Sequence, residues 1–96
     1  MTLVKIQEGP VTVIVDTDNG ARLATLEVNG LSLLVARQDN PLNWGCFPMA
    51  PWVGRLRNSS FWYGGKVRRV RKNFGPHSIH GTTFDKPWQE VGAGKF

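Results

Sequence analysis

Hydrophobic residues in the first part of the chain follow the two-residue period of β-strands. The run VTVIV at 11–15 is rich in β-branched residues and lies between Gly9-Pro10 and the turn-forming cluster DTDNG at 16–20. No apolar stripe with a 3.6-residue period reaches helical length anywhere in the sequence. The pattern therefore predicts an all-β protein built from antiparallel hairpins.

A hairpin is expected around Asn29-Gly30, which separates the hydrophobic runs ARLATLEV and LSLLVA. Asn-Gly favours a two-residue type I′ turn, because that turn needs positive φ at both central positions. On the two strands, alternate apolar residues then share one face. These residues are Ala24, Leu26 and Val28 before the turn and Leu31, Leu33 and Val35 after it.

Prolines and glycines interrupt the alternation between residues 37 and 60, and large side chains lie among them. Each proline restricts the residue before it to extended conformations, so this region is expected to be a long, ordered loop. Such loops cap a core or line a site. The residues that mark it are Pro41, Gly45, Pro48, Pro51 and Gly54, with Trp44, Phe47, Met49 and Trp52 between them.

A second hairpin is predicted from FWY (61–63), Gly64-Gly65 and KVRRVRK (66–72), and PWQEV at 87–91 is expected to begin a further strand. These units would form an open sheet with exposed edges, which proteins normally cover or pair. We therefore expect either self-association through the strand edges or a place in a larger β domain.

Ninety-six residues suffice for one domain, and the charge of this chain is unevenly distributed. The net charge is +5, yet all seven acidic residues lie within 8–39 or 85–90. A basic surface of this kind attracts phosphates, nucleic acid or an acidic surface. The basic residues of the region that lacks acidic ones are Arg55, Arg57, Lys66, Arg68, Arg69, Arg71 and Lys72.

The lone cysteine, Cys46, rules out an intrachain disulfide and fits a reducing compartment. The apolar runs are far shorter than a bilayer span, and the N-terminus lacks the apolar segment of a secretory signal. We expect a cytoplasmic protein with no membrane partner.

The segment GPHSIHG at 75–81 holds both histidines of the chain, His77 and His80. Structural zinc needs four ligands, typically as two close pairs, and Cys46 is the only thiol, so no metal site is expected. Two readings stay open: histidines on an exposed loop, or a histidine that faces a ligand and exchanges protons with it. The segment lacks the nucleophile elbow of hydrolases, and the sequence has no phosphate-binding glycine loop.

Two further features bear on ligand binding, a basic run and an arginine beside aromatic residues. The basic run RRVRK at 68–72 follows FWY, as in proteins that bind single-stranded nucleic acid, but it lacks the RNA-recognition consensus. We expect no nucleic-acid partner. Arg55 follows two proline-containing turns and Trp52, a setting that can hold a guanidinium beside an aromatic face. Fixed donors next to a ring suit a sugar.

The segments GCFPMAPWVGRLRNSSFWYGGK (45–66) and PHSIHG (76–81), followed by Trp88, together resemble the aldose 1-epimerase, or galactose mutarotase, family. The resemblance implies that residues 1–96 are a single partial domain, the N-terminal part of a mutarotase-like β-supersandwich. It also implies an isomerase that interconverts the α and β anomers of free hexoses by acid–base ring opening, without a metal or organic cofactor.

By position, Arg55 matches the family arginine that hydrogen-bonds sugar oxygens, and His80 matches the histidine that contacts the substrate near its ring oxygen. Gly54 stands where the family usually has asparagine. The family's second histidine and its glutamate base come from a later part of the domain, and the resemblance places neither Asp85 nor Glu90 in the base role. We therefore expect part of a sugar-binding shell, inactive alone. The alternative is a non-enzymatic carbohydrate-binding β-sandwich module.

Overall fold

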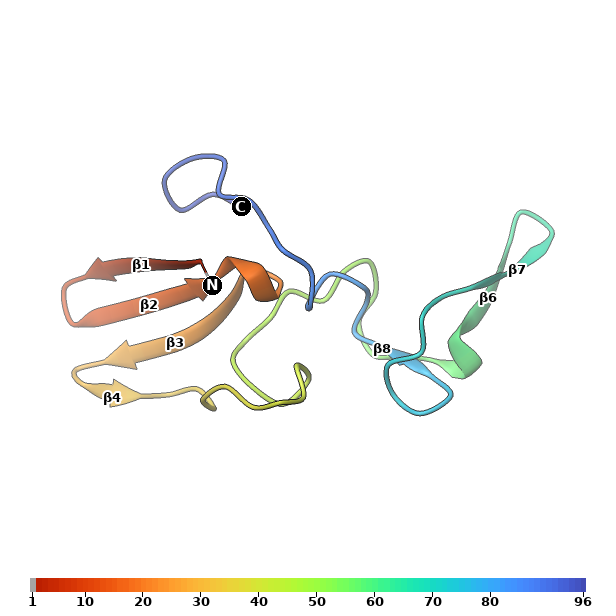
Figure 1. Cartoon of the computed structure of the whole chain (residues 1–96), viewed down its shortest axis with the longest axis horizontal. Coiled ribbons are helices and arrows are strands. Elements are labelled where there is room, and N and C mark those ends of the chain that lie inside the picture. Colours follow the sequence, from red (N-terminus) through yellow and green to blue (C-terminus); the bar gives the residue numbers. More distant parts are fainter. Residues whose placement is uncertain (1) are drawn as a thin grey trace. The chain divides into compact units, whose positions relative to one another are not determined.

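The computed structural model describes residues 2–96, in which nearly all regular structure is β-strand (Figure 1). The strands form three antiparallel sheets, with orders β1-β2-β3-β4, β5-β8 and β6-β7. The predicted all-β fold class, with antiparallel hairpins and long loops, is confirmed. The elements are β1 (Leu3–Glu8), β2 (Val11–Asp16), β3 (Arg22–Val28), β4 (Leu31–Ser32), β5 (Arg55–Leu56), β6 (Ser60–Tyr63), β7 (Lys66–Arg69) and β8 (Ser78–Ile79), with the short 3₁₀ segments η1 (Thr17–Asn19) and η2 (Arg57–Ser59).

The chain divides into two compact units, which are described separately. Unit 1 consists of Met1–Pro48 and Phe84–Phe96, and unit 2 consists of Met49–Thr83. None of the helical segments within residues 2–96 has the length and apolar character needed to cross a membrane.

Unit 1 is built on the β1–β4 meander. The β3–β4 turn has Asn29 at φ 51° and Gly30 at φ 80°, as the sequence predicted for a type I′ turn. The strand after it is shorter than expected. Leu33 still donates its N–H to the Leu26 carbonyl at 2.9 Å, but the β4 ladder ends at Ser32. The apolar residues after the turn are largely exposed: Leu31, Leu33 and Val35.

The centre of unit 1 is a buried cation. The Arg22 side chain is 0% exposed, and its guanidinium carbon lies 4.1 Å from the centroid of the Trp44 ring. Burial lowers the pKa of Arg22, and the nearby Asp16 carboxylate acts in the opposite direction. Every buried donor needs an acceptor, and backbone carbonyls supply them. The guanidinium donates to the carbonyls of Asn19, Pro41, Trp44 and Phe84 at 2.7–3.0 Å.

The C-terminal segment of unit 1 does not form the strand expected at 87–91. The Trp88 N–H donates to the Thr17 carbonyl at 2.7 Å, but no ladder follows. The chain instead turns, and the Val91 N–H donates to the Lys95 carbonyl at 2.8 Å. The prediction was wrong because this turn uses the backbone groups that a strand would pair.

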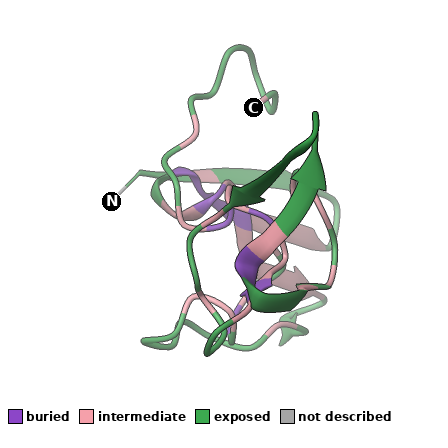
Figure 2. Cartoon of the chain, turned by 90° about the vertical axis from the view of Figure 1, so that its right-hand side faces the viewer, coloured by how far each residue is buried: buried purple, intermediate pink, exposed green. Residues whose placement is uncertain are grey.

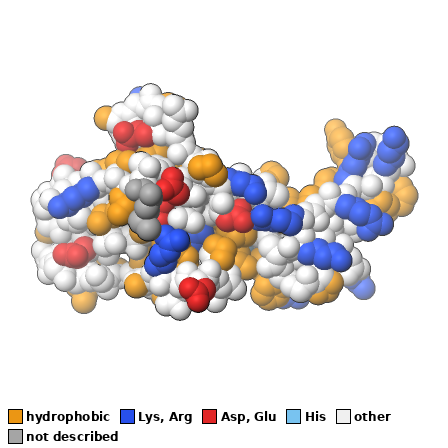
Figure 3. All heavy atoms as spheres, viewed as in Figure 1, with side chains coloured by type: hydrophobic (Ala, Val, Ile, Leu, Met, Phe, Trp, Pro, Cys, Tyr) orange, Lys and Arg blue, Asp and Glu red, His pale blue; other side chains and the backbone are white. Residues whose placement is uncertain are grey.

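Unit 2 contains the two-residue ladder of β5 and β8 and the β6–β7 hairpin. The hairpin turn has Gly64 at φ 62° and Gly65 at φ 74°, so the predicted second hairpin is present, although its return strand ends at Arg69. Figure 2 shows most of the hairpin as exposed. Lys and Arg side chains gather over it with hydrophobic ones between them (Figure 3).

Candidate functional site

The structure places Arg55 and His80 on paired backbone segments of unit 2. Arg55 begins β5, and its partner in the register is Ile79, the residue before His80. Beyond this pair, the His80 N–H donates to the Gly54 carbonyl at 3.0 Å. Two residues that the sequence separates widely are therefore one step apart across a ladder.

The backbone of Gly54 also holds the His80 ring. His80 has a positive φ of 61°, and its Nδ1 atom accepts the N–H of Gly54 at 3.2 Å. An atom that accepts a backbone N–H carries no proton, so the neutral imidazole has its hydrogen on Nε2. The Nε2 atom is therefore the donor of the neutral ring.

Arg55 is exposed, and its guanidinium carbon lies 5.1 Å from the centroid of the Phe74 ring. Arginine stacked on an aromatic face keeps its planar donors in a defined orientation. Unit 2 has no Asp or Glu, so its own side chains offer the guanidinium no carboxylate. The donors of Arg55 can thus reach the oxygens of a ligand.

His77 has a structural contact of its own. Its Nδ1 atom accepts the Asn58 N–H at 3.0 Å, and its backbone exchanges two hydrogen bonds with Phe74, both at 3.0 Å. These bonds close the turn Phe74-Gly75-Pro76-His77. The backbone of His77, rather than its ring, therefore closes the loop that precedes His80.

The structure shows why glycine follows His80 in the sequence. Gly81 has φ 78°, and a Cβ at this position would collide with the backbone of Ala50. The Thr82 N–H donates to the Ala50 carbonyl at 2.7 Å, which holds the two segments together. Gly54 differs, since it has φ 83° but nothing within 4 Å of an added Cβ.

The other candidate groups of the sequence belong to unit 1. Asp85 and Glu90 belong to unit 1, as does the exposed thiol of Cys46. Within residues 2–96, no group of three or more His, Cys, Asp or Glu side chains is arranged to hold a metal ion.

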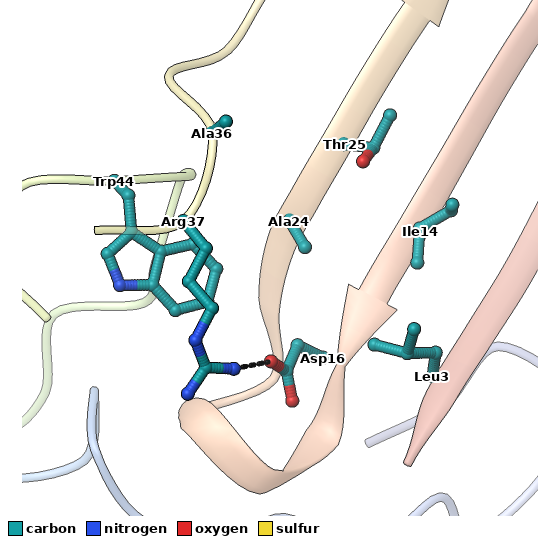
Figure 4. Close-up of a pocket in the computed structure, with 8 residues that line it drawn as sticks. All are labelled: Leu3, Ile14, Asp16, Ala24, Thr25, Ala36, Arg37 and Trp44. Atoms are coloured by element: carbon teal, nitrogen blue, oxygen red, sulfur yellow. Dashed lines mark ion pairs between the residues drawn. The ribbon is translucent and has the colours of Figure 1, made fainter. Parts of the chain in front are cut away.

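Unit 1 has a cavity of about 220 Å³ that the sequence did not indicate (Figure 4). An ion pair lies at one end, where Arg37 Nη1 is 3.6 Å from Asp16 Oδ2. Asp16 already accepts hydrogen bonds from Asp18 and Asn19, so its carboxylate has a structural task. The remaining lining is mainly apolar and consists of Leu3, Ile14, Ala24, Thr25, Ala36 and Trp44.

Sequence reasoning missed two residues of the site in unit 2. It expected an aromatic face for Arg55 near Trp52, whereas the ring that Arg55 contacts is that of Phe74. It also gave no role to Asn73, whose side chain binds the backbone of Ile79. Only the pairing of β5 with β8 brings Asn73 and Phe74 close to Arg55. Strands of two residues show almost no periodic pattern in a sequence, so this pairing could not be predicted.

Comparison with known proteins identifies the family and the fold of this chain. The family model described as aldose 1-epimerase matches residues 2–95. The crystal structure of a candidate aldose 1-epimerase from Escherichia coli K12 is similar in fold, with a TM-score of 0.78 and 22% sequence identity. The match covers 95% of this chain and 32% of that one, so the chain spans about a third of the length of that protein. The search of curated proteins finds no match. The match over residues 2–95 shows that the chain belongs to the aldose 1-epimerase family.

Proposed function

We propose that this chain provides part of the sugar-contacting shell of an enzyme that interconverts the α and β anomers of free hexoses. The observation that carries the proposal is the pairing of β5 with β8, which sets Arg55 beside the segment that ends in His80. Family membership supports a sugar as the ligand. In this view residues 1–96 are a single partial domain of a mutarotase-like sandwich.

The chemistry of the two side chains fits ring opening. Anomer exchange requires a proton at the ring oxygen and removal of the proton from the anomeric hydroxyl, and each such step contributes about 10²–10⁴-fold. The neutral His80 ring has its proton on Nε2, which suits a contact with the ring oxygen. The Arg55 guanidinium would donate to sugar hydroxyl oxygens and orient the ring.

A carboxylate base is the part that unit 2 lacks, because it contains no Asp or Glu side chain. We therefore propose that the ninety-six residues alone bind a hexose weakly and show little or no epimerase activity. Polarimetry on freshly dissolved α-D-glucose or α-D-galactose tests this directly. A rate well above that of buffer, abolished by His80→Ala, would overturn the proposed inactivity.

The same lack of a carboxylate favours a second candidate, a carbohydrate-binding module without catalysis. Calorimetric titration with galactose, glucose and an oligosaccharide separates the two. Tighter binding of the oligosaccharide favours the module, and binding of the free hexose alone favours the shell of an epimerase.

We also propose that the isolated chain associates with copies of itself. The β6–β7 hairpin exposes aromatic side chains on both faces, since Trp62 pairs with Val67 while Tyr63 pairs with Lys66. Trp62 and Tyr63 are 74% and 72% exposed. A two-stranded hairpin of this kind is marginally stable until one of its faces is covered.

A further inference from the structure

We propose that Asn73 is the positioning residue of this site. Its side-chain amide takes the place of a neighbouring strand and fixes Ile79 opposite Arg55, and with it the next residue, His80, opposite Gly54. The effect on binding depends on the sugar-contacting role proposed above, whereas the effect on the His80 ring does not.

The first step concerns the direction of the Ile79 backbone. Because the His80 N–H donates to the Gly54 carbonyl, His80 and Gly54 occupy a hydrogen-bonded position of the β5–β8 ladder. Positions alternate along an antiparallel pair, so the neighbouring pair of Arg55 and Ile79 is not hydrogen-bonded. The N–H and C=O of Ile79 therefore point away from β5, to the side on which no strand within residues 2–96 pairs with β8.

Asn73 satisfies both of these groups. The Ile79 N–H donates to Asn73 Oδ1 at 2.7 Å, and Asn73 Nδ2 donates to the Ile79 carbonyl at 3.1 Å. A primary amide has one donor and one acceptor edge, which matches the pair of bonds that a strand residue exchanges. A single side chain thus completes the ladder on its open side.

Asn73 is itself held in place. Its N–H donates to the His77 carbonyl at 3.1 Å, within the turn that His77 and Phe74 close. The residue that follows it, Phe74, provides the ring beneath the guanidinium of Arg55. The dipeptide Asn73-Phe74 therefore supports both of the proposed sugar-binding residues. Asn73 binds the backbone directly before His80, and the Phe74 ring contacts the Arg55 guanidinium.

The ladder needs this support because it is short. β5 and β8 have two residues each, and the ring of His80, rather than a backbone carbonyl, accepts the last N–H. Loss of the amide would leave two backbone groups without a partner and allow β8 to move. The His80 ring would then lose the fixed acceptor geometry at Nδ1.

The test uses Asn73→Ala in the full chain, with Asn40→Ala as the matched control. Asn40 Oδ1 accepts the Leu42 N–H at 2.9 Å in unit 1, so the control also removes one amide that binds backbone. Three quantities are measured: amide hydrogen exchange at Ile79 and His80, the ¹⁵N shifts of the His80 ring, and the affinity for D-galactose by titration. The ring shifts report the tautomer, which a loss of stability without repositioning would leave unchanged in the folded molecules.

We expect Asn73→Ala to speed exchange at Ile79 about fivefold or more, to change the ring shifts toward mixed tautomers, and to weaken galactose binding about two- to tenfold, the effect of one or two hydrogen bonds. Asn40→Ala should leave all three unchanged. Asn73→Asp keeps an acceptor for the Ile79 N–H but loses the Nδ2 donor, so it should give intermediate values. It also serves as the test variant if Asn73→Ala does not fold.

A folded Asn73→Ala or Asn73→Asp protein with unchanged exchange and ring shifts would overturn the positioning role. If the unaltered chain shows no galactose binding, the proposed function fails, while exchange and ring shifts still decide the role of Asn73. Weaker binding in the Asn40→Ala control, to the same extent, would likewise count against it.

Discussion

The Nδ1 atom of His80 accepts the backbone N–H of Gly54 at 3.2 Å, in the position where a regular ladder would use a backbone carbonyl. The ring is thereby part of the β structure as well as of the proposed site. Its tautomer and orientation are coupled to the backbone directly before Arg55, so substitutions at either end of this bond should affect sugar binding.

Replacing His80 by alanine should weaken hexose binding about two- to tenfold, because one donor to the sugar is lost along with the acceptor for Gly54. His77→Ala is the matched control, since it removes an acceptor for the Asn58 N–H in the same loop. It should leave the affinity nearly unchanged. Titration calorimetry with galactose measures both variants, and equal losses would argue against a specific role for His80.

Gly54→Asn should strengthen hexose binding by about two- to tenfold, the effect of one added hydrogen bond. The position has φ 83° and open space around an added Cβ, and asparagine tolerates this region better than most residues. Gly54→Ala is the control, because it carries the backbone cost without the amide. No gain of the asparagine variant over the alanine variant would contradict the prediction.

Gly81→Ala should destabilise unit 2 severely, by more than about 3 kcal/mol, since the positive φ and the collision with Ala50 add together. Gly65→Ala has a similar φ of 74° but no atom within 4 Å of the added Cβ. It should cost only about 1–2 kcal/mol. Urea unfolding followed by tryptophan fluorescence compares them, and similar losses would show that the contact with Ala50 is not tight.

Arg22→Met should destabilise unit 1 by more than about 3 kcal/mol, because it leaves several buried carbonyls without a donor. Arg37→Met is the control; that side chain is 55% exposed, so its ion pair contributes less than about 1 kcal/mol. The lowered pKa of Arg22 means that burial disfavours the charged form, but the group stays protonated in both states near neutral pH. The difference between the variants should therefore not change with pH in that range. Urea titrations at several pH values check both statements.

Sedimentation of the isolated chain should show association that increases with protein concentration and with salt. Salt screens the mutual repulsion of the basic residues in unit 2, whereas burial of Trp62 and Val67 is not weakened by it. Trp62→Ser should reduce the association, and Lys5→Ser, on β1, serves as a control. A clean monomer with a sharp two-state melt would count against the exposed hairpin as an association surface.

The sequence predicted those parts of the fold that local rules determine. Asn29-Gly30 and Gly64-Gly65 specify their turns because their backbone conformations are nearly exclusive to such residues. The motif series from Gly45 to Trp88 indicated the family, which the match over residues 2–95 confirms. The sugar-binding roles of Arg55 and His80 remain predictions.

The parts that could not be predicted depend on contacts between distant segments. Nothing near Arg22 in the sequence signals that this arginine is buried, because its acceptors are carbonyls from residues as far away as Phe84. The pairing of β5 with β8 could not be predicted either, because strands of two residues cannot show a hydrophobic period. The strand expected at 87–91 was wrong because the turn from Val91 to Lys95 uses the backbone groups that a strand would pair.

The two hydrogen bonds between the Asn73 side chain and the Ile79 backbone have a consequence for the order of folding. It closes a loop of six residues, whereas the bonds between Gly54 and His80 span twenty-six. Closing the longer loop costs about 1.3 kcal/mol more in chain entropy, so the short turn should form first and present an ordered edge. β5 would then pair with a strand whose turn has already formed, and Arg55 and His80 would reach their final geometry in that last step.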